Sequence, residues 1–257
     1  VYIENGRVEN LDVNDPISIN FDENDYGLPT GLKNPELTTM KWHHGHNGSI
    51  VNGIPRIGFM KGGNKAKWKD EDMADTFLNK AKEYLNKSKN NPFFLFYSLQ
   101  QPHVPRTPNP RFIGKSQMGP RGDAIIEADW CIGELYKTLE ENKLLENTLI
   151  IFSSDNGPVL NDGYFDNAVE MLGEHSPAGG LRGGKYSLFE AGTRVPFIAY
   201  WKDKIKAGVS DQLISQIDLF NTVSKIIDSD FRTQDGKDVS NLILNNTGEG
   251  RNELVIE

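Results

Sequence analysis

The chain has 257 residues, of which 37% are hydrophobic and 25% charged, and its formal net charge is −8. This length suits one large, globular α/β domain. The acidic balance argues against nucleic acid as a partner. No apolar run approaches the about 20 residues that a membrane helix needs, and the single cysteine excludes an internal disulfide.

The first 67 residues are expected to consist mainly of loops. Alternating residues around Asn5-Gly6, a strong turn pair, predict a hairpin close to Val1. Residues 20–37 are rich in Asn, Asp, Gly and Pro, a composition that predicts a surface loop.

Three of the five histidines lie close together, at His43, His44 and His46. A zinc site is one interpretation, although no cysteine or acidic residue lies nearby. A second interpretation is that His44 and His46 line a substrate pocket, and a third is that the segment is a packed polar loop. The sequence leaves these alternatives open.

Helices and strands are predicted along the rest of the chain. Apolar residues recur at helical spacing in residues 70–88, 118–142 and 215–228. Short apolar runs bounded by turn residues predict buried strands at residues 93–99, 149–152 and 195–201. A further apolar run at Leu254–Ile256 favours one more strand.

Several polar residues in these elements are predicted to be structural. Ser215 with Asp218 three positions later resembles a capping box. Cys131 lies in the middle of a predicted helix and is expected to be a buried core residue. Asp162 and Asp166 are expected to be ordinary loop carboxylates.

His103 follows the predicted strand at 93–99 and is flanked by Pro102 and Pro105. The two prolines restrict the loop, and a histidine suits proton transfer to a leaving group near neutral pH. Arg106 and Arg111 come shortly after it. They are either substrate contacts or solvated surface side chains.

Two oxygen-bearing side chains, Asp155 and Asn156, come directly after the predicted strand at 149–152. The crevice beyond strand ends is where open α/β sheets bind ligands, and such oxygens suit Ca²⁺ or Mg²⁺. Downstream, Arg182 and Lys185 enclose two glycines. This pattern favours an anion that approaches the backbone closely.

Three stretches together resemble the sulfatase family: Phe93–Pro105, Ser153–Pro158 and Gly183–Phe197. The likeness runs from about Trp68 to Asp228 and is greatest to bacterial sulfatases that act on sulfated glycans. It implies hydrolysis of sulfate esters on a sulfated carbohydrate or aryl sulfate.

The resemblance also implies an α/β fold of the alkaline-phosphatase type, with a mixed, largely parallel sheet flanked by helices. We expect one partial catalytic domain, incomplete on its N-terminal side. Residues 1–67 would form a loop-rich segment on the substrate side, residues 68–228 the α/β core, and residues 229–257 a truncated C-terminal end.

Sulfatases convert the cysteine of a Cys-x-Pro-Ser-Arg motif into formylglycine, whose hydrated form attacks sulfur. Cys131 is followed by Ile-Gly-Glu and does not match this motif. The resemblance places the nucleophile and the remaining metal ligands before Val1. The isolated chain is therefore expected to be inactive.

The resemblance assigns a role to each candidate site residue. Asp155 and Asn156 would bind Ca²⁺, or Mg²⁺ in its place. Lys185 would contact the sulfate and His103 the leaving oxygen. The expected substrate contacts are His44, His46, His175 and Arg182. Lys41 and His43 partly match a Gly-Lys-Trp-His motif of the family, which leaves their role open.

Two other functions are compatible with the sequence. A phosphatase or phosphonate hydrolase of the same superfold is one, although such enzymes use more His and Asp metal ligands. A non-catalytic module that binds sulfated glycans is the other, and it would not need Asp155. We expect a periplasmic or secreted protein and self-association through an exposed sheet edge.

Overall fold

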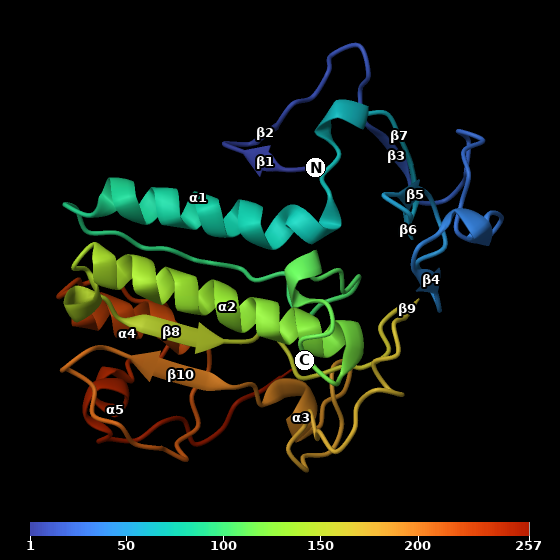
Figure 1. Cartoon of the computed structure of the whole chain (residues 1–257). Coiled ribbons are helices and arrows are strands. Elements are labelled where there is room, and N and C mark those ends of the chain that lie inside the picture. The colour runs from blue at the N-terminus through green and yellow to red at the C-terminus, as the bar shows by residue number, and fades with distance from the viewer. Residues whose placement is uncertain (257) are drawn as a thin grey trace. The chain divides into compact units, whose positions relative to one another are not determined.

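The computed structural model describes residues 1–256 and is shown in Figure 1. The chain forms two compact units. Unit 1 comprises Val1–Leu139 and Val159–His175, and unit 2 comprises Glu140–Pro158 and the residues from Ser176 onward. Each unit is described by itself below. The domain boundaries predicted from the sequence stay a prediction.

Two long helices, α1 (Met73–Ser88) and α2 (Gly119–Glu141), form the helical part of unit 1. Helix α1 buries Ala74, Leu78, Ala81 and Leu85, which recur on one face as the helical period requires. Ala74 and Leu78 pack with Cys131 of α2. Figure 1 shows the two helices side by side, with the segment that follows α1 running between them.

That connecting segment, residues 93–99, differs from the prediction. It is extended and its side chains alternate between half-buried and exposed, but it forms no strand ladder with any part of the described chain. Phe94 and Phe96 are 78% and 81% exposed, whereas Tyr97 and Leu99 pack on the α1–α2 core. The buried strand predicted from the apolar run is therefore wrong, because only alternate side chains have a core to pack against.

Unit 1 also contains four short antiparallel ladders. They are β1 (Ile3–Glu4) with β2 (Arg7–Val8), β3 (Ser18–Asn20) with β7 (Phe59–Lys61), β4 (Lys41–Trp42) with β9 (Tyr164–Phe165), and β5 (Ile50–Val51) with β6 (Ile54–Pro55). The predicted hairpin is confirmed, since Asn5 and Gly6 both adopt positive φ between β1 and β2.

Unit 2 is built on the antiparallel pair β8 (Ile150–Ser153) and β10 (Phe197–Tyr200). Its helices are α3 (Glu190–Thr193), α4 (Asp218–Ile226) and α5 (Ser240–Asn245). The core joins Val239, Leu242 and Ile243 to apolar side chains from β10 and the start of α4. Single 3-10 turns across both units lie at Pro35–Leu37, Asn64–Ala66, Asp70–Asp72, Pro110–Phe112 and Leu145–Asn147.

The pairing of strands departs from the expected sheet. Every ladder among residues 1–256 is antiparallel, so the largely parallel sheet is not formed by these residues. The run at Leu254–Ile256 is not a strand; the nearby bridge is instead between Leu213 and Arg251. The α/β class itself is confirmed, and no helix among the described residues has the length and apolarity to cross a membrane.

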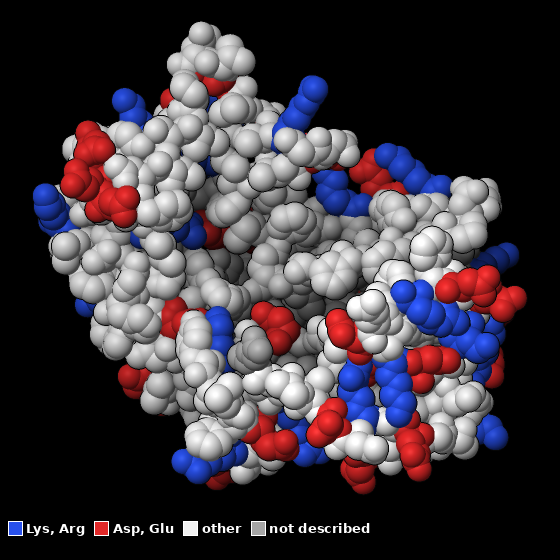
Figure 2. Space-filling view, turned by 180° about the vertical axis from the view of Figure 1, so that it is seen from behind, with Lys and Arg blue, Asp and Glu red and all other residues white. Residues whose placement is uncertain are grey.

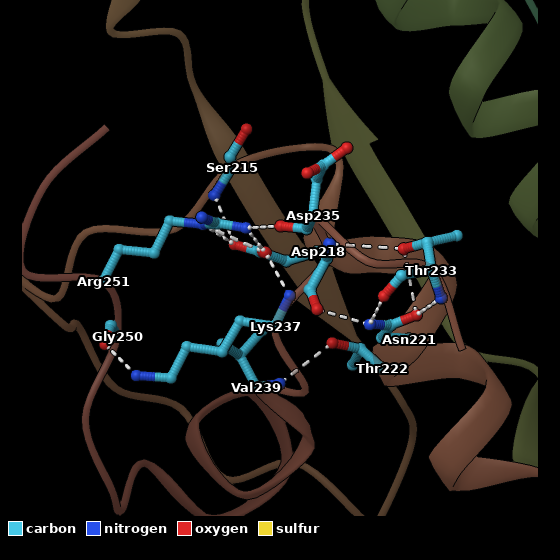
Figure 3. A network of polar contacts seen from close by, with 11 residues as sticks. Ser215, Asp218, Asn221, Thr222, Thr233, Asp235, Lys237, Val239, Gly250 and Arg251 are labelled. Carbon is cyan, nitrogen blue, oxygen red and sulfur yellow. Dashed lines mark hydrogen bonds and ion pairs between the residues drawn. The ribbon is translucent and has the colours of Figure 1, made fainter. Parts of the chain in front are cut away.

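A buried ion pair ties the C-terminal segment to α4, as Figure 3 shows. Asp218 is fully buried and accepts hydrogen bonds from the guanidinium of Arg251. It also accepts from the backbone N–H groups of Ser215 (2.9 Å) and Lys237 (2.7 Å). The bond from Ser215 is the contact predicted by the capping box, and Asp218 is structural as expected.

Loss of this carboxylate is expected to destabilise the protein. Asp218→Asn removes one partner of a buried pair, which costs about 3–5 kcal/mol of unfolding free energy because Arg251 is left uncompensated. Urea unfolding at pH 7 measures the change. Glu146→Gln is the control, since Glu146 pairs with Lys202 at 3.1 Å on the surface and is 75% exposed; its effect should stay below about 1 kcal/mol. Equal effects of the two variants would contradict the prediction.

The same carboxylate predicts acid sensitivity. Burial alone would raise the pKa of Asp218, but Arg251 and the N–H groups of Lys237 and Ser215 outweigh it and hold that pKa below its usual value. The stabilisation is therefore present above about pH 4, the ordinary pKa of Asp, and is lost as the pH falls towards the lowered pKa. Unfolding curves over this range should show the difference between wild type and Asp218→Asn shrinking with acid.

Candidate functional site

The loop that carries Asp155 and Asn156 begins where β8 ends. Ser154 Oγ donates to Asn156 O at 3.0 Å, and Asn156 Nδ2 donates to Gly157 O at 2.9 Å. These local bonds define the turn. The Asp155 side chain is exposed beyond the strand end, and an Asp carboxylate and an Asn amide oxygen are both hard donors.

A second loop of unit 2 is fastened to this turn through backbone groups. Gly157 N donates to Gly192 O at 2.9 Å, and Lys185 N donates to Pro158 O at 3.0 Å. The approach at Gly157 is so close that a Cβ atom there would lie 1.6 Å from Ala191 O. The structure thus brings the backbone of Lys185 to the end of the turn that carries Asp155 and Asn156.

The loop around Lys185 is basic and contains local hydrogen bonds. Ser187 Oγ accepts from Gly184 N at 3.1 Å and donates to Gly184 O at 2.8 Å, which closes a turn over Lys185. The Arg182 guanidinium lies 3.8 Å from the ring centroid of Phe189, a cation–π contact that fixes its direction. Two cations three positions apart on one loop are suited to an anionic group.

His103 lies on an exposed loop of unit 1, with 61% of its side chain accessible. Its Nδ1 lies 2.7 Å from Val104 O and must carry a proton to bond that carbonyl. Its Nε2 lies 3.8 Å from Oδ2 of Asp162, whose side chain is only 9% exposed. The predicted role of Asp162 as an ordinary loop carboxylate overlooked this contact, because 58 intervening residues give no sequence signal for it.

The histidine-rich segment packs against the residues that follow Asp162. His43 N donates to Gly163 O at 2.7 Å, and the ring of His46 lies 4.6 Å from that of Tyr164. Gly163 has no room for a side chain, since a Cβ atom would lie 2.0 Å from His46 Nδ1. Residues 162–165 therefore gather His43, His46 and His103 along one short segment.

The remaining histidines occupy different settings. His44 Nδ1 lies 2.7 Å from His43 Nδ1, so one of the two nitrogens acts as acceptor. His175 lies in a separate exposed turn, where its N–H donates to Leu172 O at 3.3 Å. Residues 1–256 contain no group of three or more His, Cys, Asp or Glu side chains placed to hold a metal, so the zinc interpretation finds no support.

Two arginines near His103 form ion pairs within unit 1. Arg106 is 4% exposed and pairs with Asp166 at 2.8 Å. Arg111 pairs with Asp75 at 2.6 Å and lies over the ring of Trp130 at 4.3 Å. Arg106 is therefore a buried residue and not a solvated surface side chain, whereas Arg111 stays partly exposed at the surface.

Cys131 is a core residue and not a nucleophile. It is fully buried between α1 and α2, as predicted. Burial raises the pKa of its thiol to about 11, which keeps the sulfur protonated at neutral pH.

Charge on the surface is mixed. Figure 2 shows Lys and Arg side chains interleaved with Asp and Glu on the face in view, consistent with a net charge of −8 made from both signs. An anionic ligand must then depend on local groups such as Arg182 and Lys185, because screening limits the reach of distant charges to about 8 Å at physiological salt.

Comparison with known proteins identifies similar sequences and structures. The family model described as Sulfatase matches residues 13–229. An N-acetylgalactosamine-6-O-sulfatase of Bacteroides thetaiotaomicron is 52% identical over 227 residues, which are 88% of this chain and 44% of that protein. A solved structure, described under the metabolism of multiple glycosaminoglycans by Bacteroides thetaiotaomicron, is 48% identical to this chain and has a TM-score of 0.94. The match covers 97% of this chain and 52% of that one.

A sulfatase structure from a Pseudoalteromonas species is more distant, with 31% identity and a TM-score of 0.61 over 72% of this chain and 37% of that one. The chain belongs to the sulfatase family. The structural matches confirm the alkaline-phosphatase-like fold expected from the resemblance. The chain spans less than half the length of the Bacteroides relative.

The contact at Gly157 gives a test of the two-loop arrangement. Gly157→Ala places a methyl group against Ala191 O, so the loops must separate, and overpacking of this kind costs about 1–3 kcal/mol of unfolding free energy. Gly133→Ala is the control: Gly133 lies within α2 with open space around it, and alanine there should stabilise by about 0.5–1 kcal/mol. Urea unfolding measures both changes in unfolding free energy. An unchanged unfolding free energy in Gly157→Ala would contradict the close contact.

Proposed function

We propose that this chain is part of an enzyme that hydrolyses sulfate esters on sulfated glycans. The observation that carries the proposal is the bond from Lys185 N to Pro158 O, which joins the anion-binding loop to the turn bearing Asp155 and Asn156. Oxygen donors for a cation and a cationic side chain for an anion thus lie on two joined loops. In the proposed reaction, the cation and the cationic side chain would both act on the sulfate group of the ester.

Asp155 and Asn156 supply oxygen donors of the kind that a hard cation such as Ca²⁺ takes. They supply a fraction of the about six to eight oxygens that Ca²⁺ takes, and the remaining ligands are expected in the longer protein. When bound, the ion would polarise the sulfate oxygens. Mg²⁺ is the alternative ion.

The other site residues have roles that follow from their chemistry. Lys185 would neutralise charge that develops on the sulfate oxygens, assisted by Arg182. His103, through Nε2, would protonate the leaving oxygen. His44, His46 and His175 stay predicted substrate contacts, and the role of Lys41 and His43 stays open.

By resemblance to the family, the nucleophile is expected to be a formylglycine in the longer protein, since Cys131 does not match the family motif and is fully buried. The 257-residue chain by itself should therefore release no sulfate. By resemblance to bacterial glycan sulfatases, the whole protein is inferred to act in the periplasm or outside the cell. Self-association stays a prediction, and the exposed Phe94 and Phe96 are the residues that would favour it.

Sulfate release by the intact, matured protein tests this function. N-acetylgalactosamine 6-sulfate is the first substrate, because the Bacteroides relative is named for that reaction. Lys185→Ala should lower kcat about 100- to 1000-fold, the usual cost of removing one transition-state contact. Lys206→Ala, an exposed lysine of unit 2, is the control and should leave the rate unchanged.

Parallel assays separate the rival functions. Phosphate release without sulfate release would identify a phosphatase of the same superfold. Binding of a sulfated sugar with no turnover and no effect of Asp155→Ala would identify a glycan-binding module. Sulfate release by the isolated chain would contradict the assignment of the nucleophile to the longer protein.

Calcium dependence provides a further test. Chelation should abolish sulfate release by the intact protein, and added Ca²⁺ should restore it. Asp155→Asn should raise the Ca²⁺ concentration needed for thermal stabilisation by about 10- to 100-fold or more, since even outer-shell changes cost that much affinity. Asp211→Asn, an exposed residue of the same unit, is the control. An unchanged Ca²⁺ dependence in Asp155→Asn would remove this residue from the metal site.

A further inference from the structure

Arg106 is a buried charged residue near His103, and its guanidinium has four acceptors. Its Nε donates to Pro102 O at 2.8 Å, and its Nη2 donates to Val159 O at 3.1 Å. Its Nη1 donates to Leu160 O at 3.0 Å and to Asp166 Oδ2 at 2.8 Å. The side chains of Arg106 and Asp166 are 2% and 3% exposed.

These acceptors lie on two segments of unit 1 that both contact His103. Pro102 is the residue directly before His103, and the segment from Val159 to Asp166 contains Asp162, whose Oδ2 lies 3.8 Å from His103 Nε2. Arg106 therefore fixes the backbone that carries the imidazole and also the segment that carries the carboxylate facing it.

The same loop is held from its other side by α2. Glu127 is 2% exposed, and its carboxylate accepts from Gln101 Nε2 at 2.8 Å and from Asn109 N at 3.0 Å. His103 is thus flanked by two buried charged anchors, Glu127 and Arg106, while its own ring is 61% exposed. A mobile loop tip would not need anchors of this kind.

Stability alone is a weak reason to bury this ion pair. Removing a guanidinium from water costs several kcal/mol, and apolar packing often stabilises equally well. Arg121 adds to the cost, since burial first and then repulsion from Arg106 lower its pKa. What a planar guanidinium offers is direction, because its N–H groups hold several acceptors in fixed positions at once.

We propose that Arg106, held by Asp166, is a positioning residue that fixes the orientation of His103 for proton transfer. This inference rests on the proposed function and on His103 as the proton donor. As sulfur is attacked by the oxygen nucleophile, the bond from sulfur to the leaving oxygen breaks and its electron pair stays on that oxygen. The proton of His103 Nε2 forms the new O–H bond and leaves a neutral imidazole, while Nδ1–H stays bonded to Val104 O.

The leaving group distinguishes positioning from a general structural role. A sugar alkoxide is a poor leaving group and needs the proton, whereas 4-nitrophenolate leaves readily without it. Arg106→Lys in the intact enzyme should lower kcat on the sulfated sugar about 100-fold, the cost of about 1 Å of misplacement, with little change in KM. On 4-nitrophenyl sulfate the same variant should stay within about threefold of wild type, because that reaction barely uses the acid.

Further variants complete the test. His103→Gln should show the same selective loss, and the double variant should be no slower than His103→Gln alone, since the two residues act through one proton transfer. Arg111→Lys, in a surface pair with Asp75, is the matched control and should leave both substrates unaffected. If Arg106→Lys does not fold, Asp166→Asn replaces it in the same test, because this variant leaves the three carbonyl partners of Arg106 in place.

The outcomes separate the inference from the function on which it rests. Equal losses on both substrates, or no loss on either, would show that Arg106 does not position the acid even though the enzyme is a sulfatase. A His103→Gln enzyme without selective loss would overturn the role of His103, and Arg106 with it. Absence of sulfate release from the wild-type enzyme would overturn the proposed function itself.

Discussion

The close backbone contact between Gly157 and the residues Ala191 and Gly192 is the constraint on which unit 2 depends. No side chain fits at Gly157, and the N–H there bonds directly to Gly192 O. Because backbone meets backbone, the separation of the two loops is set by hydrogen-bond length and not by side-chain packing. The spacing of the loops that carry Asp155, Asn156 and Lys185 therefore depends on backbone contacts.

Each unit adds a buried arginine–aspartate pair to this scheme, and the two pairs act differently. Arg251 and Asp218 join the C-terminal segment to α4, so they hold the unit together. Arg106 and Asp166 instead join two loops, one of which carries His103 and the other Asp162. The first pair stabilises the packing of α4, and the second fixes the geometry of two loops whose apolar residues Val104 and Tyr164 share one small buried cluster.

Much of the fold was predictable because the signals are local. The spacing of Ala74, Leu78, Ala81 and Leu85 defines α1, and Asn5-Gly6 defines the first hairpin. The segment at 93–99 shows the limit of such signals. An apolar run indicates burial, but whether both faces are buried depends on neighbours that the run does not specify.

The candidate site also contains residues that local motifs reveal and contacts that they do not. Asp155, Asn156 and Lys185 were found from short motifs, and the structure brings their loops together. The contacts of Asp162 with His103 and of Arg106 with Asp166 were not predicted, since each joins residues about 60 positions apart. The choice between a solvated and a buried arginine depends on such distant partners, which one sequence without its fold does not reveal.

The return of Val159–His175 to unit 1 has a consequence for folding. Tyr164 donates to Pro55 O across 109 positions, and β9 supplies the partner of β4. Ordering such distant segments costs loop-closure entropy before any contact repays it, so these steps are slow. During synthesis on a ribosome, β8 of unit 2 emerges before residues 159–175. The histidine-rich segment can therefore pair with residues 159–175 only after part of unit 2 has been synthesised. The contacts that Val159, Leu160 and Asp166 make with the loop of His103 also become available at this stage, after both long helices have been synthesised.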